Sequence, residues 1–153
     1  MCYSAQIQAD YRRYVKMFGA QMDIREFARL FWARAEGSKA KVPKAVEDAF
    51  LDPQTDDERQ IKAFIDRFNA EQAATLEQDL FKQRKRLADA ERALEAKVTK
   101  AAIESRRIAT DKIDSNLRRL DDLRRTTSKD RDSRIFPGHY APVLVVENGH
   151  YVY

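Results

Sequence analysis

The residue best suited to chemistry is Cys2, which becomes the N-terminal residue once Met1 is removed. Its α-amine and its thiol are then carried by adjacent carbons, with reference pKa values of about 7.7–8.0 and about 8.5. Both groups therefore reach their reactive forms near neutral pH. The amine condenses with an aldehyde to an imine, and the thiolate then closes on the imine carbon to give a thiazolidine. Because the small side chain of Cys2 suits an aminopeptidase, we predict that Met1 is removed.

Other interpretations of Cys2 remain open at this point, because a two-residue motif has a high false-positive rate. Cys2 is equally compatible with a small apolar residue in an edge strand. As a nucleophile, it would also fit an N-terminal-cysteine amidotransferase, in which the thiol attacks a glutamine amide and the amine acts as base. In a third interpretation the chain is a non-enzymatic coiled-coil interaction protein and Cys2 is incidental.

Two further sets of residues could form a binding site: a basic run and the two histidines. The run Lys82–Arg86 is the densest basic segment, and it predicts either a surface that follows a phosphate backbone or a solvated helix face. The solvated face is favoured, because acidic residues surround the run and base-stacking aromatics are absent from it. His139 and His150 belong to no set with zinc-ligand spacing, so neither a metal nor another cofactor is expected.

Composition limits the class of protein. The chain has 153 residues, of which 35% are charged, and its 29 Lys and Arg are interleaved with 25 Asp and Glu. This balance is typical of long solvated helices, and it permits a polyanionic partner without requiring one. No apolar run reaches membrane-spanning length, and no signal peptide is visible. A lone cysteine suits a reducing compartment, so a cytoplasmic, nucleoid-associated location is expected.

Residues 1–52 are predicted to contain a short strand near Cys2, followed by helices that carry most of the core. One helix is expected between Asp10 and Gly19, a second ends at Gly37, and a shorter one follows Pro43. The first two helices carry most of the aromatic residues, including Trp32, so this segment is the best candidate for core; the aromatic residues on their apolar faces are Tyr11, Tyr14, Phe18, Phe27 and Phe31.

Residues 53–130 are predicted to form a charged helical insertion. The chain has neither Gly nor Pro between Pro53 and Pro137, and Thr55 is a suitable N-cap. A coiled-coil seam is indicated by the seven-residue spacing of Leu80, Leu87 and Leu94. One uninterrupted helix would leave this narrow apolar stripe in water. We therefore predict an antiparallel hairpin that bends between Thr99 and Asp111, or self-association with a second chain.

Residues 131–153 change to β-type sequence. Ala141–Val146 is rich in β-branched residues, Asn148-Gly149 is a strong hairpin signal, and His150–Tyr153 is the predicted returning strand. A chain that stops in this strand would expose an unpaired edge, so we expect the sequence to be the front part of a longer protein. Together the three segments predict an α+β fold that is mostly helical.

Two segments at the ends of the chain carry a family likeness: Met1–Tyr11, and Arg134–Gly138 leading into the strand Ala141–Val146. They resemble the SRAP (SOS-response-associated peptidase) family of abasic-site processing proteins. It covers mainly the first fifty and the last twenty residues, and the charged helices between them look like an insertion in the common fold.

This resemblance implies a specific activity. Family members capture the aldehyde of an abasic site in single-stranded DNA with the N-terminal cysteine, and they remove the residues ahead of it. Peptidase and lyase chemistry in the DNA-damage response is implied, with Cys2 as the catalytic residue. The family's other functional positions, an Asn, a Glu and a His, would lie beyond Tyr153, and DNA-contacting residues cannot be assigned.

Overall fold

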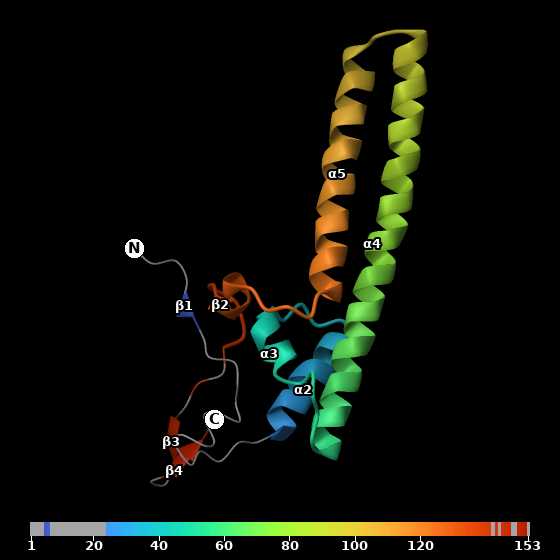
Figure 1. The fold of residues 1–153 in the computed structure, drawn as a ribbon. Helices are drawn as coiled ribbons and strands as arrows, with labels where there is room; N and C mark the ends of the chain where they lie inside the picture. The colour runs from blue at the N-terminus through green and yellow to red at the C-terminus, as the bar shows by residue number, and fades with distance from the viewer. Residues whose placement is uncertain (1–4, 7–23, 142, 144, 148–149, 153) are drawn as a thin grey trace. The chain divides into compact units, whose positions relative to one another are not determined.

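The computed structural model describes residues 5–6, 24–141, 143, 145–147 and 150–152. Cys2 and the predicted helix between Asp10 and Gly19 lie outside these ranges. The described residues are mostly helical, as the sequence predicts (Figure 1). The elements in chain order are β1 (Ala5–Gln6), α2 (Ile24–Ala35), α3 (Lys44–Asp48), α4 (Asp56–Ala96), α5 (Lys100–Arg124), the 3-10 helix η1 (Asp130–Ser133), β2 (Arg134–Ile135), β3 (Val145–Glu147) and β4 (His150–Val152).

The chain divides into two compact units. Unit 1 comprises Met1–Phe68 with Thr126–Tyr153, and unit 2 comprises Asn69–Arg125. The boundary therefore falls within α4, whose first turns belong to the core of unit 1. Unit 2 contains the remainder of α4 and the whole of α5.

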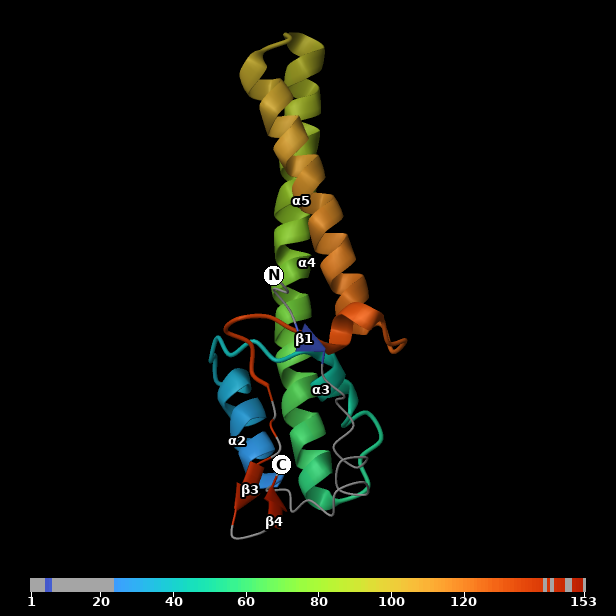
Figure 2. The same cartoon turned by 90° about the vertical axis from the view of Figure 1, so that its left-hand side faces the viewer.

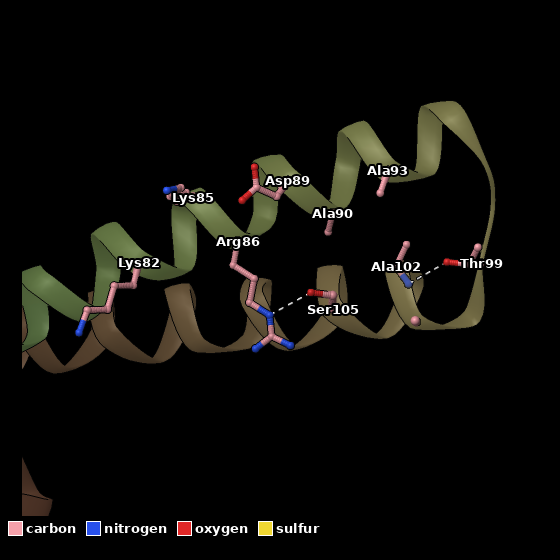
Figure 3. A pocket seen from close by; sticks show the side chains of 10 residues that line it. Lys82, Lys85, Arg86, Asp89, Ala90, Ala93, Thr99, Ala102 and Ser105 are labelled. Atoms are coloured by element: carbon pink, nitrogen blue, oxygen red, sulfur yellow. Dashed lines mark hydrogen bonds between the residues drawn. The ribbon is translucent and has the colours of Figure 1, made fainter.

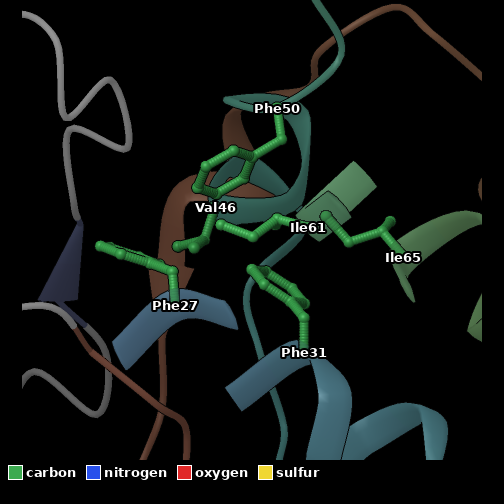
Figure 4. Close-up of a cluster of buried hydrophobic side chains, with 6 residues drawn as sticks. All are labelled: Phe27, Phe31, Val46, Phe50, Ile61 and Ile65. Carbon is green, nitrogen blue, oxygen red and sulfur yellow. The ribbon is translucent and has the colours of Figure 1, made fainter. Parts of the chain in front are cut away.

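The core of unit 1 is built from α2, α3 and the start of α4 (Figure 4). Its buried side chains are Phe27, Phe31, Val46, Phe50, Ile61 and Ile65. The ring of Phe50 packs against both Phe27 and Phe31, with centroid distances of 5.6 and 5.8 Å. Tilted and edge-on aromatic pairs of this kind stabilise a core beyond the area they bury. Trp32, which the predicted apolar face of this helix does not include, is 53% exposed, because it follows Phe31 by one position and so points away from the buried face.

Helix α2 is terminated by Gly37, two residues after its last residue, as predicted. The amide of Ser38 donates to the carbonyl of Ala33 at 2.9 Å, and the amide of Gly37 donates to the carbonyl of Arg34 at 3.0 Å. These are the two bonds of a Schellman motif, and Gly37 has the positive φ of 99° that the motif requires. Helix α3 follows Pro43 directly, where a fixed φ and a missing N–H are tolerated.

A buried ion pair joins α2 to α3. The guanidinium Nη1 of Arg34 lies 2.5 Å from Oε1 of Glu47, and the two side chains are only 9% and 12% exposed. The guanidinium carbon of Arg34 also lies 4.1 Å from the ring centroid of Phe68, which is a close cation–π contact. The pair therefore holds charge inside unit 1 with partners on two sides.

Helix α4 begins as the sequence predicts. Thr55 Oγ1 accepts from the amide of Glu58 at 3.2 Å, and the Glu58 carboxylate accepts from the amide of Gln54 at 2.6 Å. Both interactions satisfy amides that an isolated helix start would leave unpaired. The acidic residues of the first turn also suit the positive end of the helix dipole.

In unit 2, α4 and α5 lie side by side in both views and form a helical hairpin (Figures 1 and 2). Inter-helix side-chain bonds join Arg86 to Ser105 and Arg124 to Glu77, so the helices are antiparallel. The seam on α4 follows alternating intervals of four and three residues, with buried or half-buried side chains at Leu76, Leu80, Gln83, Leu87, Ala90 and Leu94. Leu80 is 8% exposed, whereas Leu87 and Leu94 are only half-buried. The three leucines therefore supply only every second position of the seam, and Leu76, Gln83 and Ala90 supply the others.

The bend of the hairpin is at residues 97–99, at the N-terminal limit of the predicted interval. Thr99 is the N-cap of α5, and its side chain accepts from the amide of Ala102 at 3.2 Å. The chain therefore reverses without Gly or Pro, by ending α4 and capping a new helix. Toward the bend, the buried residues of the two helices are small: they are Ala90 on α4 and Ala102 and Ala109 on α5.

Two short antiparallel ladders complete the described structure. β1 pairs with β2, and β3 pairs with β4 with Val145 opposite Val152 and Glu147 opposite His150. The predicted turn residues between β3 and β4, Asn148 and Gly149, lie outside the described ranges. Among the described residues, no helix combines the length and apolar character that crossing a membrane requires.

Candidate functional site

The described element nearest to Cys2 in sequence is β1, which pairs with β2. Ala5 is opposite Ile135, and Gln6 is opposite Arg134. This ladder joins the start of the chain to the segment that follows the long helices. Since three peptide units separate Cys2 from Ala5, the chain cannot carry Cys2 more than about 11 Å from the ladder. The candidate site is therefore built from the residues around β2.

A tight turn follows β2 directly. The amide of His139 donates to the carbonyl of Phe136 at 3.0 Å, and Gly138 has φ of 83°. Pro137 at the second position and a positive-φ glycine at the third are the residues that a type II turn requires. No heavy atom lies within 4 Å of the position that a Cβ on Gly138 would occupy, so the glycine is needed for its backbone conformation.

The loop is anchored to the core of unit 1. The amide of Tyr140 donates to the carbonyl of Lys41 at 2.7 Å, and Lys41 also forms an isolated bridge with His139. The Tyr140 ring packs edge-on against Phe27, with 6.4 Å between centroids. Burial raises the pKa of the Tyr140 phenol above its usual value, and the negative charge of Glu26 adds to this effect.

Three chemically distinct side chains are displayed by β2 and this turn. Arg134 is exposed, Phe136 is 47% exposed, and the His139 ring meets the Phe136 ring edge-on with 5.4 Å between centroids. The Nδ1 atom of His139 is buried and has no hydrogen-bond partner among the described residues. The exposed cation and the exposed aromatic ring on this anchored loop are groups of the kind that contact phosphates and bases in single strands.

The basic run Lys82–Arg86 lies on α4 in unit 2, beside a groove between the two helices (Figure 3). The groove has a volume of about 520 Å³ and an apolar floor of alanines. Arg86 extends across it and donates from Nε to Ser105 Oγ at 2.9 Å. Its lining residues are Lys82, Lys85, Arg86, Asp89, Ala90, Ala93, Thr99, Ala101, Ala102 and Ser105.

Sequence reasoning missed two features of unit 2. Phe81, directly before the basic run, is 73% exposed, so an aromatic ring does accompany these cations. The second feature is a polar cluster in the seam, in which Asp79 accepts from Gln83 at 3.1 Å and from Asn116 at 2.8 Å. A phenylalanine directly before a basic run was a readable signal in the sequence, whereas the polar cluster depends on the register of the hairpin.

Within the described ranges, no group of three or more His, Cys, Asp or Glu side chains is placed to hold a metal ion. Comparison with protein-family profiles, with curated proteins and with solved structures found no match to the chain. The chemistry of Cys2 and the groups displayed by β2 and the turn after it are therefore the basis for a function.

Proposed function

We propose that this protein captures abasic sites in single-stranded DNA covalently, through Cys2. The chemical basis is the match between a 1,2-aminothiol and the aldehyde that a ring-opened abasic deoxyribose exposes. The observation that carries the proposal is the β1–β2 ladder, because it joins the two parts of the chain in which the SRAP resemblance is found. The helices from α4 to α5 then occupy the place of an insertion between these parts.

The reaction proceeds in two steps once Met1 has been removed. The α-amine of Cys2 attacks the aldehyde carbon, and loss of water gives an imine. The thiolate then adds to the imine carbon while the nitrogen takes up a proton, which closes the thiazolidine. Amine, thiol and aldehyde are thus converted to thiazolidine and one water, and no oxidant or metal is consumed. Removal of the residue ahead of Cys2 is a prerequisite, because an acylated nitrogen cannot form the imine.

The loop after β2 supports this function with suitable contact groups. Arg134 offers a guanidinium for a phosphate, and the exposed ring of Phe136 offers a surface on which a base can stack. The His139 ring packs edge-on against Phe136 and helps to hold that aromatic ring on the loop. These groups lie on the ladder that the chain reaches three residues after Cys2.

The test is an adduct assay on the full natural chain with a single-stranded oligonucleotide that carries one abasic site. A band that survives denaturation is expected from the natural protein and not from an oligonucleotide with a reduced abasic site. Cys2→Ser is expected to lose the stable adduct, because an oxazolidine reverts more readily than a thiazolidine. Cys2→Ala is expected to leave only a transient imine, trapped by borohydride.

Equal crosslinking by the natural protein and Cys2→Ala would show that the thiol is not the trap. Retention of Met1 in the mature protein, measured by intact mass, would exclude the mechanism because the α-amine would be an amide. Release of ammonia from glutamine by the natural protein, lost in Cys2→Ala, would instead identify an amidotransferase.

A further inference from the structure

We propose that the face of α4 formed by Phe81, Lys82 and Lys85 binds a single DNA strand non-covalently. The identity of the strand as DNA rests on the proposed function, whereas the surface itself is argued from unit 2 alone. Positions 78, 81, 82 and 85 are spaced by three and four residues, so they share one side of the helix. An aromatic ring and two ammonium groups are therefore displayed together.

The phenylalanine is the unusual member of this surface. Phe81 is 73% exposed, although it belongs to a helix whose other face packs against α5. A shallow groove beside it is lined by Ala74, Glu77, Gln78, Phe81 and Lys82. A large apolar ring held in water next to cations is the arrangement on which bases of a single strand stack while phosphates meet the ammonium groups.

The acidic residues nearest to these lysines along α4 have other partners, although the charge of Lys82 also contributes to lowering the pKa of Asp79. Asp79 is engaged by Asn116 and Gln83, and Asp89 is paired with Arg92. Among the residues that the structure describes, Lys82 and Lys85 form no ion pair. Glu91 follows Lys82 by nine residues, or two and a half turns, and so lies on the opposite side of α4.

Several other cations of the hairpin have local partners. Salt bridges join Arg107 to Glu104 and to Asp111, Arg124 to Glu77, and Arg125 to Asp122. Arg86 is held toward α5 by its bond to Ser105, which places a further guanidinium on the edge of the surface (Figure 3). Lys82 and Lys85 lie one and four residues after Phe81 on α4, so they place two positive charges beside its exposed ring.

The charge pattern selects the occupant. A second copy of this chain would bring the same cations against themselves, and like charges in contact disfavour association. A duplex would satisfy the lysines but would bury its base faces away from Phe81. A single strand supplies both phosphates and accessible bases, and it is the form of DNA in which the proposed lesion is captured.

The experiment measures binding of the full natural chain carrying Cys2→Ser to an intact fluorescent oligothymidine, by anisotropy over a range of salt. An intact strand has no aldehyde, so covalent capture does not contribute. Lys82→Gln/Lys85→Gln is expected to weaken binding about tenfold and to reduce the slope of log K against log salt by about 1.4, from about 0.7 per phosphate contact. Phe81→Ala is expected to weaken binding about tenfold with the slope unchanged.

The matched control is Arg106→Gln/Arg118→Gln, which removes the same charge from exposed positions on the other helix, α5. It is expected to change affinity less than twofold, and circular dichroism checks that every variant keeps its helices. Equal weakening by the control would overturn the proposal in favour of general charge attraction, as would natural affinity in Lys82→Gln/Lys85→Gln. A dimer in sedimentation that Phe81→Ala dissociates would overturn it in favour of self-association.

The two proposals fail in distinguishable ways. Absence of a Cys2-dependent adduct would reject the covalent function while leaving the anisotropy result as it stands. Normal adduct formation with unchanged anisotropy in Phe81→Ala and Lys82→Gln/Lys85→Gln would reject the α4 surface alone.

Discussion

Asp79 of α4 accepts a hydrogen bond from the side chain of Asn116 of α5, with 2.8 Å between Asn116 Nδ2 and Asp79 Oδ2. Asn116 is 5% exposed, and it occupies a seam that is otherwise largely apolar. Gln83, also buried, donates to the other carboxylate oxygen of Asp79 at 3.1 Å. A buried polar group in a helical seam favours the register in which its partner is opposite, because any slip leaves it unpaired.

This pair predicts a pH-dependent effect of Asn116→Ala. The bond from Asn116, followed by the bond from Gln83, lowers the pKa of Asp79. The ionised carboxylate therefore adds stability above the unfolded pKa of about 3.9, and this contribution is lost as pH falls through the folded value. Urea unfolding should show a natural-to-variant difference that is full near neutral pH and shrinks below about pH 4. A constant difference would contradict the coupling, and Glu91→Gln controls for general acid effects.

The seam predicts unequal costs for two leucines. Leu80 is 8% exposed and packs with Leu76 and Leu120, whereas Leu87 is half-buried. Leu80→Ala should lower the free energy of unfolding by about 2–4 kcal/mol, and Leu87→Ala by about half as much. Phe81→Ala is the surface control and should change stability by less than about 0.5 kcal/mol. Equal losses at both positions would show that Leu87 is buried in the seam as deeply as Leu80.

The buried pair between Arg34 and Glu47 predicts a strong asymmetry between single and double variants. Glu47→Ala leaves the Arg34 guanidinium buried without its anion, so the free energy of unfolding should fall by about 3 kcal/mol. Arg34→Met/Glu47→Leu removes both charges and should recover most of that loss. Thermal and chemical unfolding measure both quantities, and a loss under about 1 kcal/mol in Glu47→Ala would mean that the arginine finds solvent.

Gly138 provides a test of the turn after β2. Its φ of 83° is disfavoured for residues with a Cβ, and the space around it is open. Gly138→Ala should therefore cost about 1–2 kcal/mol through the backbone alone. Gly138→Asn should cost less, since asparagine tolerates this region. If alanine and asparagine cost the same, the penalty arises from a contact and not from φ.

The N-cap at the bend gives the last prediction. Thr99→Ala removes the acceptor for the amide of Ala102 and should cost about 1 kcal/mol in the free energy of unfolding. Thr99→Ser keeps the hydroxyl and should stay close to the natural value. A null effect of Thr99→Ala would show that water replaces the cap.

Local features were readable from the sequence because their signals lie within a few residues. The end of α2 follows from Gly37, the start of α4 from Thr55, and α3 from Pro43. Each depends on capping or backbone preferences that need no distant partner. The helical majority follows for the same reason, since the chain between Pro53 and Pro137 contains no breaker.

The sequence by itself determined the helical segments between residues 24 and 124, and it identified Cys2 as the candidate for aminothiol chemistry. Only the tertiary structure decided that Ala5 pairs with Ile135, that Asp79 meets Asn116, and that Trp32 and Phe81 face solvent. Capping and periodicity act over one or two turns of helix, whereas these pairings and exposures depend on where the chain bends. That bend, at residues 97–99, uses Thr99 in place of Gly or Pro, and a threonine cap is a weak signal in a charged helix.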